Sequence, residues 1–185
     1  PEHTTPEQFN SWAVIEVLEP SASCPQLEAV WEEYQKPVHI EDEVLGTLKL
    51  NRDFGLLDGE ILWNGEEVSL ALEIDLDDEE TWDTARSIAH KVMADRESWD
   101  RSRREFAAKE LTELANEWQA DDDEKKNADP ITEDAFAQRI TLSELSLTYE
   151  GDFTAYFDDD DMFWGHIVEV CGSLENGIES ANIAG

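Results

Sequence analysis

Between Val44 and Ile74 the hydrophobic residues recur at every second position, which is the period of β-strands. The segment EVSLALEI (67–74) is the clearest case, because large apolar residues alternate with small or charged ones, as in a strand with one buried face. The segments VLGTLKL (44–50) and FGLLDGEILW (54–63) precede it, and Asn64-Gly65 predicts a type I′ turn before it. These segments predict a three-stranded antiparallel meander.

The last third of the chain, from Leu142 to Leu174, predicts a second meander of three strands. Alternating apolar residues place one strand before the turn at residues 150–152 and a second strand after it. Asp158 to Asp161 form the next turn, and the third strand runs from Phe163 to Cys171. We expect the Asp run to be a solvated hairpin tip and His166 to be a structural residue of this last strand.

The segments between and before the meanders have the period of helices. Apolar residues spaced three and four apart predict two helices between Asp75 and Trp118, and two more at the N-terminus, from about Pro6 and from about Pro25 to Gln35. The predicted fold is α+β: an antiparallel sheet from two three-stranded meanders, helices packed on one face, and an N-terminal helical pair. Two separate small sheets are the alternative. The predicted domains are an N-terminal helical extension at 1–36 and an α+β domain at 37–185.

Charge narrows the range of partners. The 185 residues include 46 Asp and Glu but 13 Lys and Arg, which gives a formal net charge of -33. Such a surface repels nucleic acid and anionic lipid and attracts cationic proteins, although the same charge also serves solubility or adaptation to high salt. No apolar run reaches the roughly 20 residues of a membrane helix, so we expect no membrane segment and a cytoplasmic location. Two cysteines form no disulfide framework, and we expect buried free thiols.

The sequence contains little that points to catalysis. It lacks the motifs of nucleophilic enzymes and of phosphate-binding loops, and its Asp run lacks the spacing of a calcium loop. We therefore predict no catalytic residue, no metal ligand and no cofactor, and favour a non-enzymatic protein. A carboxylate-based metal-dependent enzyme centred on the segment from Asp158 to His166 remains the alternative.

The acidity is concentrated where the second meander lies, because no Lys or Arg follows Arg139. Acidic surfaces speed encounters with basic partners, and exposed Trp side chains often anchor such contacts. The residues predicted to contact a basic protein partner are in this closing region: Asp158, Asp159, Asp160, Asp161, Trp164, Glu150 and Asp152. The sequence gives no prediction of oligomeric state.

Three segments carry a resemblance to a known family. LGTLKLNRDFG (45–55), WDRSRREFAAKEL (99–111) and above all FDDDDMFWGH (157–166) resemble a bacterial family of unknown function, number 2262. The resemblance covers about Leu45 to Gly185 and implies no activity, catalytic residue or cofactor. It implies instead a small bacterial protein of the immunity or accessory type that accompanies secreted toxins. The leading hypothesis is therefore an immunity-type inhibitor of a basic toxin domain, such as a nuclease.

Overall fold

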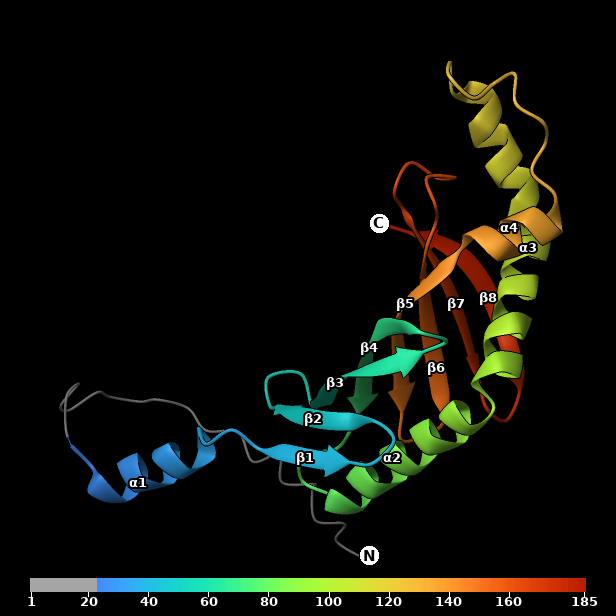
Figure 1. Ribbon diagram of the computed structural model, residues 1–185. Helices are drawn as coiled ribbons and strands as arrows, with labels where there is room; N and C mark the ends of the chain where they lie inside the picture. The colour runs from blue at the N-terminus through green and yellow to red at the C-terminus, as the bar shows by residue number, and fades with distance from the viewer. Residues whose placement is uncertain (1–22) are drawn as a thin grey trace, which may run out of the picture. The chain divides into compact units, whose positions relative to one another are not determined.

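The computed structural model describes residues 23–185, and the chain divides into two units, Pro1–Lys36 and Pro37–Gly185 (Figure 1). In the first unit, helix α1 (Pro25–Tyr34) begins with Pro at its first turn and buries none of its residues. Of the predicted N-terminal helical pair, only this second helix falls within the described residues. The predicted first helix lies in residues 1–22, outside them, so the pair itself is not observed.

The second unit is built on one eight-stranded sheet whose strands lie in sequence order. Neighbouring strands are antiparallel, except that β4 and β5 are parallel because the helical segment between them returns the chain to the same end of the sheet. The strands are β1 (His39–Asp42), β2 (Gly46–Asn51), β3 (Leu56–Trp63), β4 (Glu66–Glu73), β5 (Thr141–Thr148), β6 (Asp152–Asp158), β7 (Ile167–Ser173) and β8 (Gly177–Ala184).

The α+β class is confirmed, but the prediction of two three-stranded meanders is wrong. Each meander has a fourth strand, and the pairing of residues 69–73 with 144–148 joins both into a single sheet. Strand β1 was missed because it is only four residues long. Strand β8 was missed because a bulge at Cys171/Gly172 interrupts its pairing and its inward residues, among them Ala181, are mostly small or half-buried. The turn at Asn64-Gly65 is confirmed, with φ of 51° and 100°.

Two long helices cover one face of this sheet, as Figure 1 shows: α2 (Glu79–Ala94) and α3 (Arg96–Asp121). The short helix α4 (Glu133–Arg139) packs on α3. Helix α2 packs on β4 and β5, and α3 packs on β7 and β8. Asp78 caps α2 by accepting the N–H of Glu80 at 3.0 Å. The inward stripes of both long helices meet the sheet at Ala85, Ala89, Val92, Trp99, Ala107, Ala108, Leu111 and Ala115, which are all buried.

The core therefore lies between the helices and one side of the sheet. One end of the core contains a buried hydrogen bond, in which Trp63 Nε1 donates to the carboxylate of Asp100 at 3.2 Å. The ring of Trp99 packs edge-on against Trp63 and Phe153, and the guanidinium of Arg103 lies 4.0 Å from the Trp99 ring. Burial lowers the pKa of Arg103 to about 10. The opposite side of the sheet carries no helix of the unit 37–185, and this uncovered side is called the open face below.

Candidate functional site

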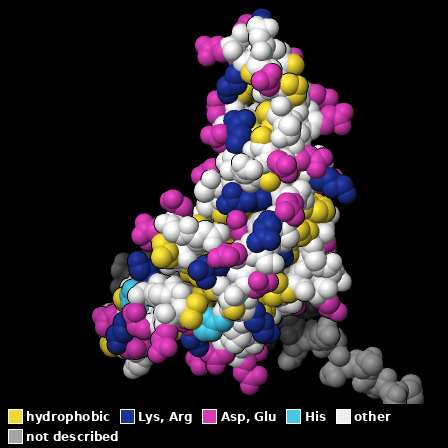
Figure 2. Space-filling model, turned by 45° about the vertical axis from the view of Figure 1, so that its right-hand side comes forward, with side chains coloured by type: hydrophobic (Ala, Val, Ile, Leu, Met, Phe, Trp, Pro, Cys, Tyr) yellow, Lys and Arg dark blue, Asp and Glu magenta, His cyan; other side chains and the backbone are white. Residues whose placement is uncertain are grey.

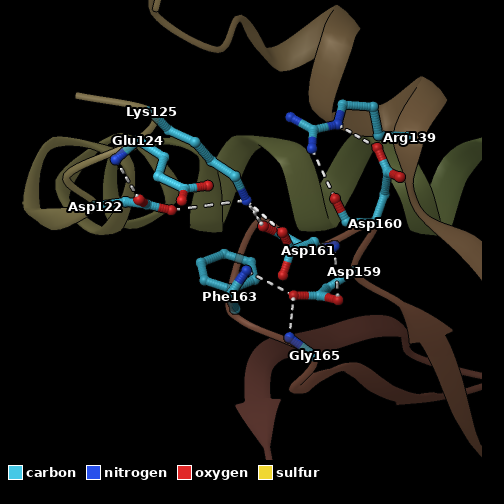
Figure 3. Close-up of polar contacts among 9 residues, drawn as sticks. All are labelled: Asp122, Glu124, Lys125, Arg139, Asp159, Asp160, Asp161, Phe163 and Gly165. Atoms are coloured by element: carbon cyan, nitrogen blue, oxygen red, sulfur yellow. Dashed lines mark hydrogen bonds and ion pairs between the residues drawn. The ribbon is translucent and has the colours of Figure 1, made fainter. Parts of the chain in front are cut away.

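Asp159 organises the loop from Asp159 to His166, which joins β6 to β7 (Figure 3). Its side chain is turned into this loop and away from solvent. One carboxylate oxygen of Asp159 accepts the backbone N–H of Phe163 at 2.6 Å and of Gly165 at 3.2 Å. The other accepts the N–H of Asp161 at 3.1 Å, and the side chain is 4% exposed. The expectation of a solvated tip is thus wrong for Asp159, because three backbone donors hold its charge inside the loop.

The next two aspartates form ion pairs with Arg139 at the end of α4 and with Lys125 in the turn between α3 and α4, as Figure 3 shows. Asp160 accepts from Arg139 at the end of α4, with Nε to Oδ2 at 2.7 Å. Asp161 accepts from Lys125 through its carboxylate and, at 2.9 Å, through its carbonyl oxygen. The hydrogen bond that Lys125 donates to the Asp161 carboxylate, together with the negative charges of Asp161 and Asp122, outweighs desolvation and raises the pKa of Lys125. These two carboxylates therefore anchor the loop to the helical layer.

Trp164 is the exposed apolar residue of this loop. Its side chain is 56% exposed, its φ is 59°, and its ring packs on Trp118 of α3 at a centroid distance of 4.7 Å. A non-glycine residue in the left-handed region is strained and needs support from its surroundings. Asp159 and Trp118 supply that support on the side of the helices.

The other residues predicted to bind a partner lie elsewhere. Glu150 is exposed in the turn between β5 and β6, while Asp152 and Asp158 begin and end β6. The side chains of Asp152 and Asp158 alternate with the buried Phe153, Ala155 and Phe157, so both lie on the open face. The predicted surface is therefore split between one loop and the two ends of a strand, and its role in binding stays a prediction.

The open face brings together carboxylates that the sequence pattern left unconnected. Strand pairing aligns a row across the sheet, with Glu60 opposite Ser69, Ser69 beside Glu144, Glu144 opposite Tyr156, and Tyr156 opposite Glu169. We call Glu60, Glu144 and Glu169 the carboxylate row. Burial, followed by the negative charge of Glu169 and Glu144, raises the pKa of Tyr156. This electrostatic effect agrees with a concentration of negative charge along the row.

A hollow of about 580 Å³ lies at the β2 to β5 part of this face. Its lining includes Asp58, Glu60 and Glu144, and Ala71 and Ser69 lie between them. Lys49 also lines it, opposite Asp58 in the neighbouring strand. Carboxylates thus outnumber cations around the hollow, and small side chains leave room above the sheet.

Charge is divided unequally between the two layers. The eight strands contain a single Lys or Arg, Lys49, and twelve acidic residues: Glu41, Asp42, Asp58, Glu60, Glu66, Glu67, Glu73, Glu144, Asp152, Asp158, Glu169 and Glu179. Helices α2 to α4 contain eight of the basic residues, and Figure 2 shows Lys and Arg spaced among Asp and Glu over this helical side. The helical surface is mixed in sign, whereas the sheet is almost wholly acidic.

A second acid-base contact lies at the edge of the helical layer. Asp42 at the end of β1 accepts from His90 Nε2 of α2 at 2.8 Å and from the N–H groups of Val44 and Leu45. Burial on its own raises the pKa of Asp42, but these hydrogen bonds outweigh it, and the pKa lies below its usual value. The donors are all internal, so this contact ties β1 to α2.

The described residues offer few features of metal or redox chemistry. Within residues 23–185, no three or more His, Cys, Asp or Glu side chains are placed to hold one metal ion. Cys24 and Cys171 are free thiols, but both are half-buried rather than buried as expected. Burial raises the pKa of the Cys171 thiol. No helix of the described part of the chain is both long and apolar enough to cross a bilayer.

Fold and surface together define a two-layer α+β protein with one helix-covered face and one acidic open face. The chain belongs to a family of uncharacterized proteins conserved in bacteria (DUF2262), whose model matches residues 42–183. The resemblance seen in the sequence is thereby confirmed. No curated protein and no solved structure matches the chain significantly.

Proposed function

We propose that this protein is a non-enzymatic binding protein that captures a basic protein partner on the open face of its sheet. The observation that carries the proposal is the charge of the strands, which hold twelve carboxylates and one lysine. Asp42 turns to α2, but most of the others alternate with buried residues and lie on the open face, among them Asp58, Glu60, Glu73, Glu144, Asp152, Asp158 and Glu169. A face of one sign attracts a partner of opposite sign and raises the rate of encounter. The most specific form of the proposal is an immunity-type inhibitor that covers the active site of a basic toxin domain, such as a nuclease.

Two features of the open face favour a role in binding a partner over a role in solubility alone. The carboxylate row places like charges on alternate strands, and the charges of Glu169 and Glu144 add to burial in raising the pKa of Tyr156, which lies between them. Like charges held close together on a folded surface are costly to stability, whereas solubility needs only that charge be dispersed. A cationic partner relieves this repulsion when it binds.

The alternative, a metal-dependent enzyme at the segment from Asp158 to His166, has weaker support. Asp159, Asp160 and Asp161 turn to three different internal partners and do not converge on a common point (Figure 3). A bound cation needs several oxygen ligands directed at one centre. The loop geometry therefore favours a structural role for these aspartates.

The proposal is tested with the product of the neighbouring gene, the natural candidate for a toxin that an immunity protein accompanies. Its affinity for the full-length protein is measured by titration calorimetry at low and at raised salt. We expect a complex whose dissociation constant rises about tenfold or more with salt, because screening weakens contacts between exposed charges. No complex, or a partner that binds through an acidic face, would contradict the proposal.

A further inference from the structure

The open face has a floor of small side chains. Strand pairing aligns Ala71, Ser146, Thr154, Cys171 and Ser180 in one row across β4 to β8. None of these side chains is longer than that of threonine or cysteine, so the row lies lower than the glutamates beside it. The hollow of about 580 Å³ spans β2 to β5 and meets this row at Ala71. Beyond Ala71 the row continues with Asp58 on β3 and Lys49 on β2, which also line the hollow.

Carboxylates border the floor on both sides. The carboxylate row lies two residues along the strands in one direction, and Glu73 and Asp152 lie two residues along in the other. Two residues of a strand span about 6.7 Å, so the trough between the borders is about 13 Å wide. An α-helix with its side chains is about 10–12 Å across and matches this width, whereas a single extended strand is much narrower.

The spacing of the glutamates in the carboxylate row matches the spacing of residues seven apart on an α-helix. Glu60, Glu144 and Glu169 lie on β3, β5 and β7, which are alternate strands. Alternate strands are about 9.6 Å apart, and residues seven apart on an α-helix are about 10.5 Å apart on nearly the same face. Lysines or arginines at every seventh position of such a helix can therefore each lie opposite one glutamate of the row. The small difference between the two spacings is accommodated by the length and flexibility of the basic side chains.

We infer that this trough receives a cationic α-helix of the partner protein, laid across the strands with basic residues seven apart facing Glu60, Glu144 and Glu169. The inference rests on the proposed function and specifies the form of the partner. A helix on the open face completes a three-layer arrangement in which both sides of the sheet are covered. Small floor residues let the helix approach the sheet closely.

Charge complementarity favours a basic helix of a partner over two other possible occupants of the trough. Helix α1 of this chain contains Glu28, Glu32 and Glu33 and no Lys or Arg, so it has the same sign as the trough. A second copy of the chain brings a net charge of -33 against an equal charge. Both occupants are repelled where a basic helix is attracted.

The test uses synthetic helical peptides of one composition and the full-length protein. One peptide has three lysines at positions i, i+7 and i+14 in an alanine-rich background, and its isomer has them at i, i+5 and i+10, which spreads them around the helix. A third peptide repeats the first with two central prolines, which prevent helix formation. Binding is followed by amide chemical shifts of the protein at low salt.

We expect the first peptide to bind at least fivefold more tightly than the other two and to shift the amides of Ser69, Ala71, Ser146 and Thr154. The Glu60→Gln/Glu144→Gln/Glu169→Gln variant should lose the preference between isomers. Equal binding of the isomers, tighter binding of the proline peptide, or shifts confined to another surface would overturn the inference. If the basic partner binds the protein while the peptides show no preference, the helix model fails and the proposed function stands.

Discussion

Asp159 accepts the backbone N–H of Phe163 at 2.6 Å, which places a carboxylate with 4% exposure inside the loop between β6 and β7. The same oxygen also accepts from Gly165, so one side chain fixes the path of the loop that presents Trp164. The run of four aspartates, the most acidic motif of the sequence, thus serves mainly to stabilise the conformation of this loop.

The first prediction concerns this carboxylate. Asp159→Asn should lower the free energy of unfolding by about 2–3 kcal/mol, because it removes charge-assisted hydrogen bonds and turns an amide donor toward backbone donors. Asp160→Asn is the control, since the exposed pair with Arg139 is worth about 1 kcal/mol or less. Urea denaturation measures both. Equal losses in the two variants would contradict the structural role of Asp159.

The second prediction concerns pH. The pKa of Asp42 is lowered in the folded protein, so its carboxylate stabilises the fold above its unfolded pKa of about 3.9, and this contribution is lost as pH falls through the folded pKa. Asp42→Asn should therefore be less stable than the wild type at pH 7, and the gap should shrink below about pH 4. Denaturation across pH 2.5–7 tests this. A gap independent of pH would show that charge at Asp42 is not responsible.

The third prediction concerns the bulge between β7 and β8. A Cβ at Gly172 would lie 2.2 Å from the carbonyl oxygen of Gly177 and 2.9 Å from the Cα of Ile178, both backbone atoms that cannot turn aside. Gly172→Ala should cost at least about 3 kcal/mol, the upper range for overpacking. Gly151→Ala meets no atom within 4 Å and should cost only the strain of its φ of 99°, about 1 kcal/mol. Thermal unfolding ranks the two, and the reverse order would refute the packing at Gly172.

The fourth prediction distinguishes partner binding at the open face from partner binding at the loop residues that the sequence predicted. Trp164 lies toward α3, where it packs on Trp118, so Trp164→Ala should change the affinity for a basic partner by no more than about twofold if the partner occupies the open face. Titration calorimetry with the partner provides the measurement. A loss of tenfold or more would instead make Trp164 a central contact and return the binding surface to the loop.

The sequence predicted much of the fold because local signals agreed with the tertiary structure. Asn64-Gly65 supplied both positive φ angles of its turn, and the strict alternation of residues 67–74 fixed which side chains of β4 enter the core. The edge strands were missed since β1 is short and β8 has few large apolar residues. Their strand conformation depends on pairing with a neighbour more than on their own residues.

The candidate site was harder to predict because it depends on contacts between distant segments. Four consecutive aspartates look alike in the sequence, yet Asp159 is buried while Asp160 and Asp161 pair with cations 21 and 36 residues away. The carboxylate row could not be recognised in the sequence, since its members come from separate strands that the parallel pairing of β4 with β5 brings into one sheet. The alternation of residues 67–74 indicated which side chains of β4 lie on the open face, but none of the three glutamates of the row lies in that segment.

In the proposed complex, the position of negative charge, and not its amount, determines binding to a basic partner. Glu60→Gln/Glu144→Gln/Glu169→Gln removes three charges from the open face, and Glu110→Gln/Glu113→Gln/Glu117→Gln removes three exposed charges from α3, so both variants have the same net charge. Calorimetric titration of both with the basic product of the neighbouring gene is the direct measurement. We predict a loss of affinity of about tenfold or more for the open-face variant and less than about threefold for the α3 variant. Equal losses, or a larger loss for the α3 variant, would contradict the claim.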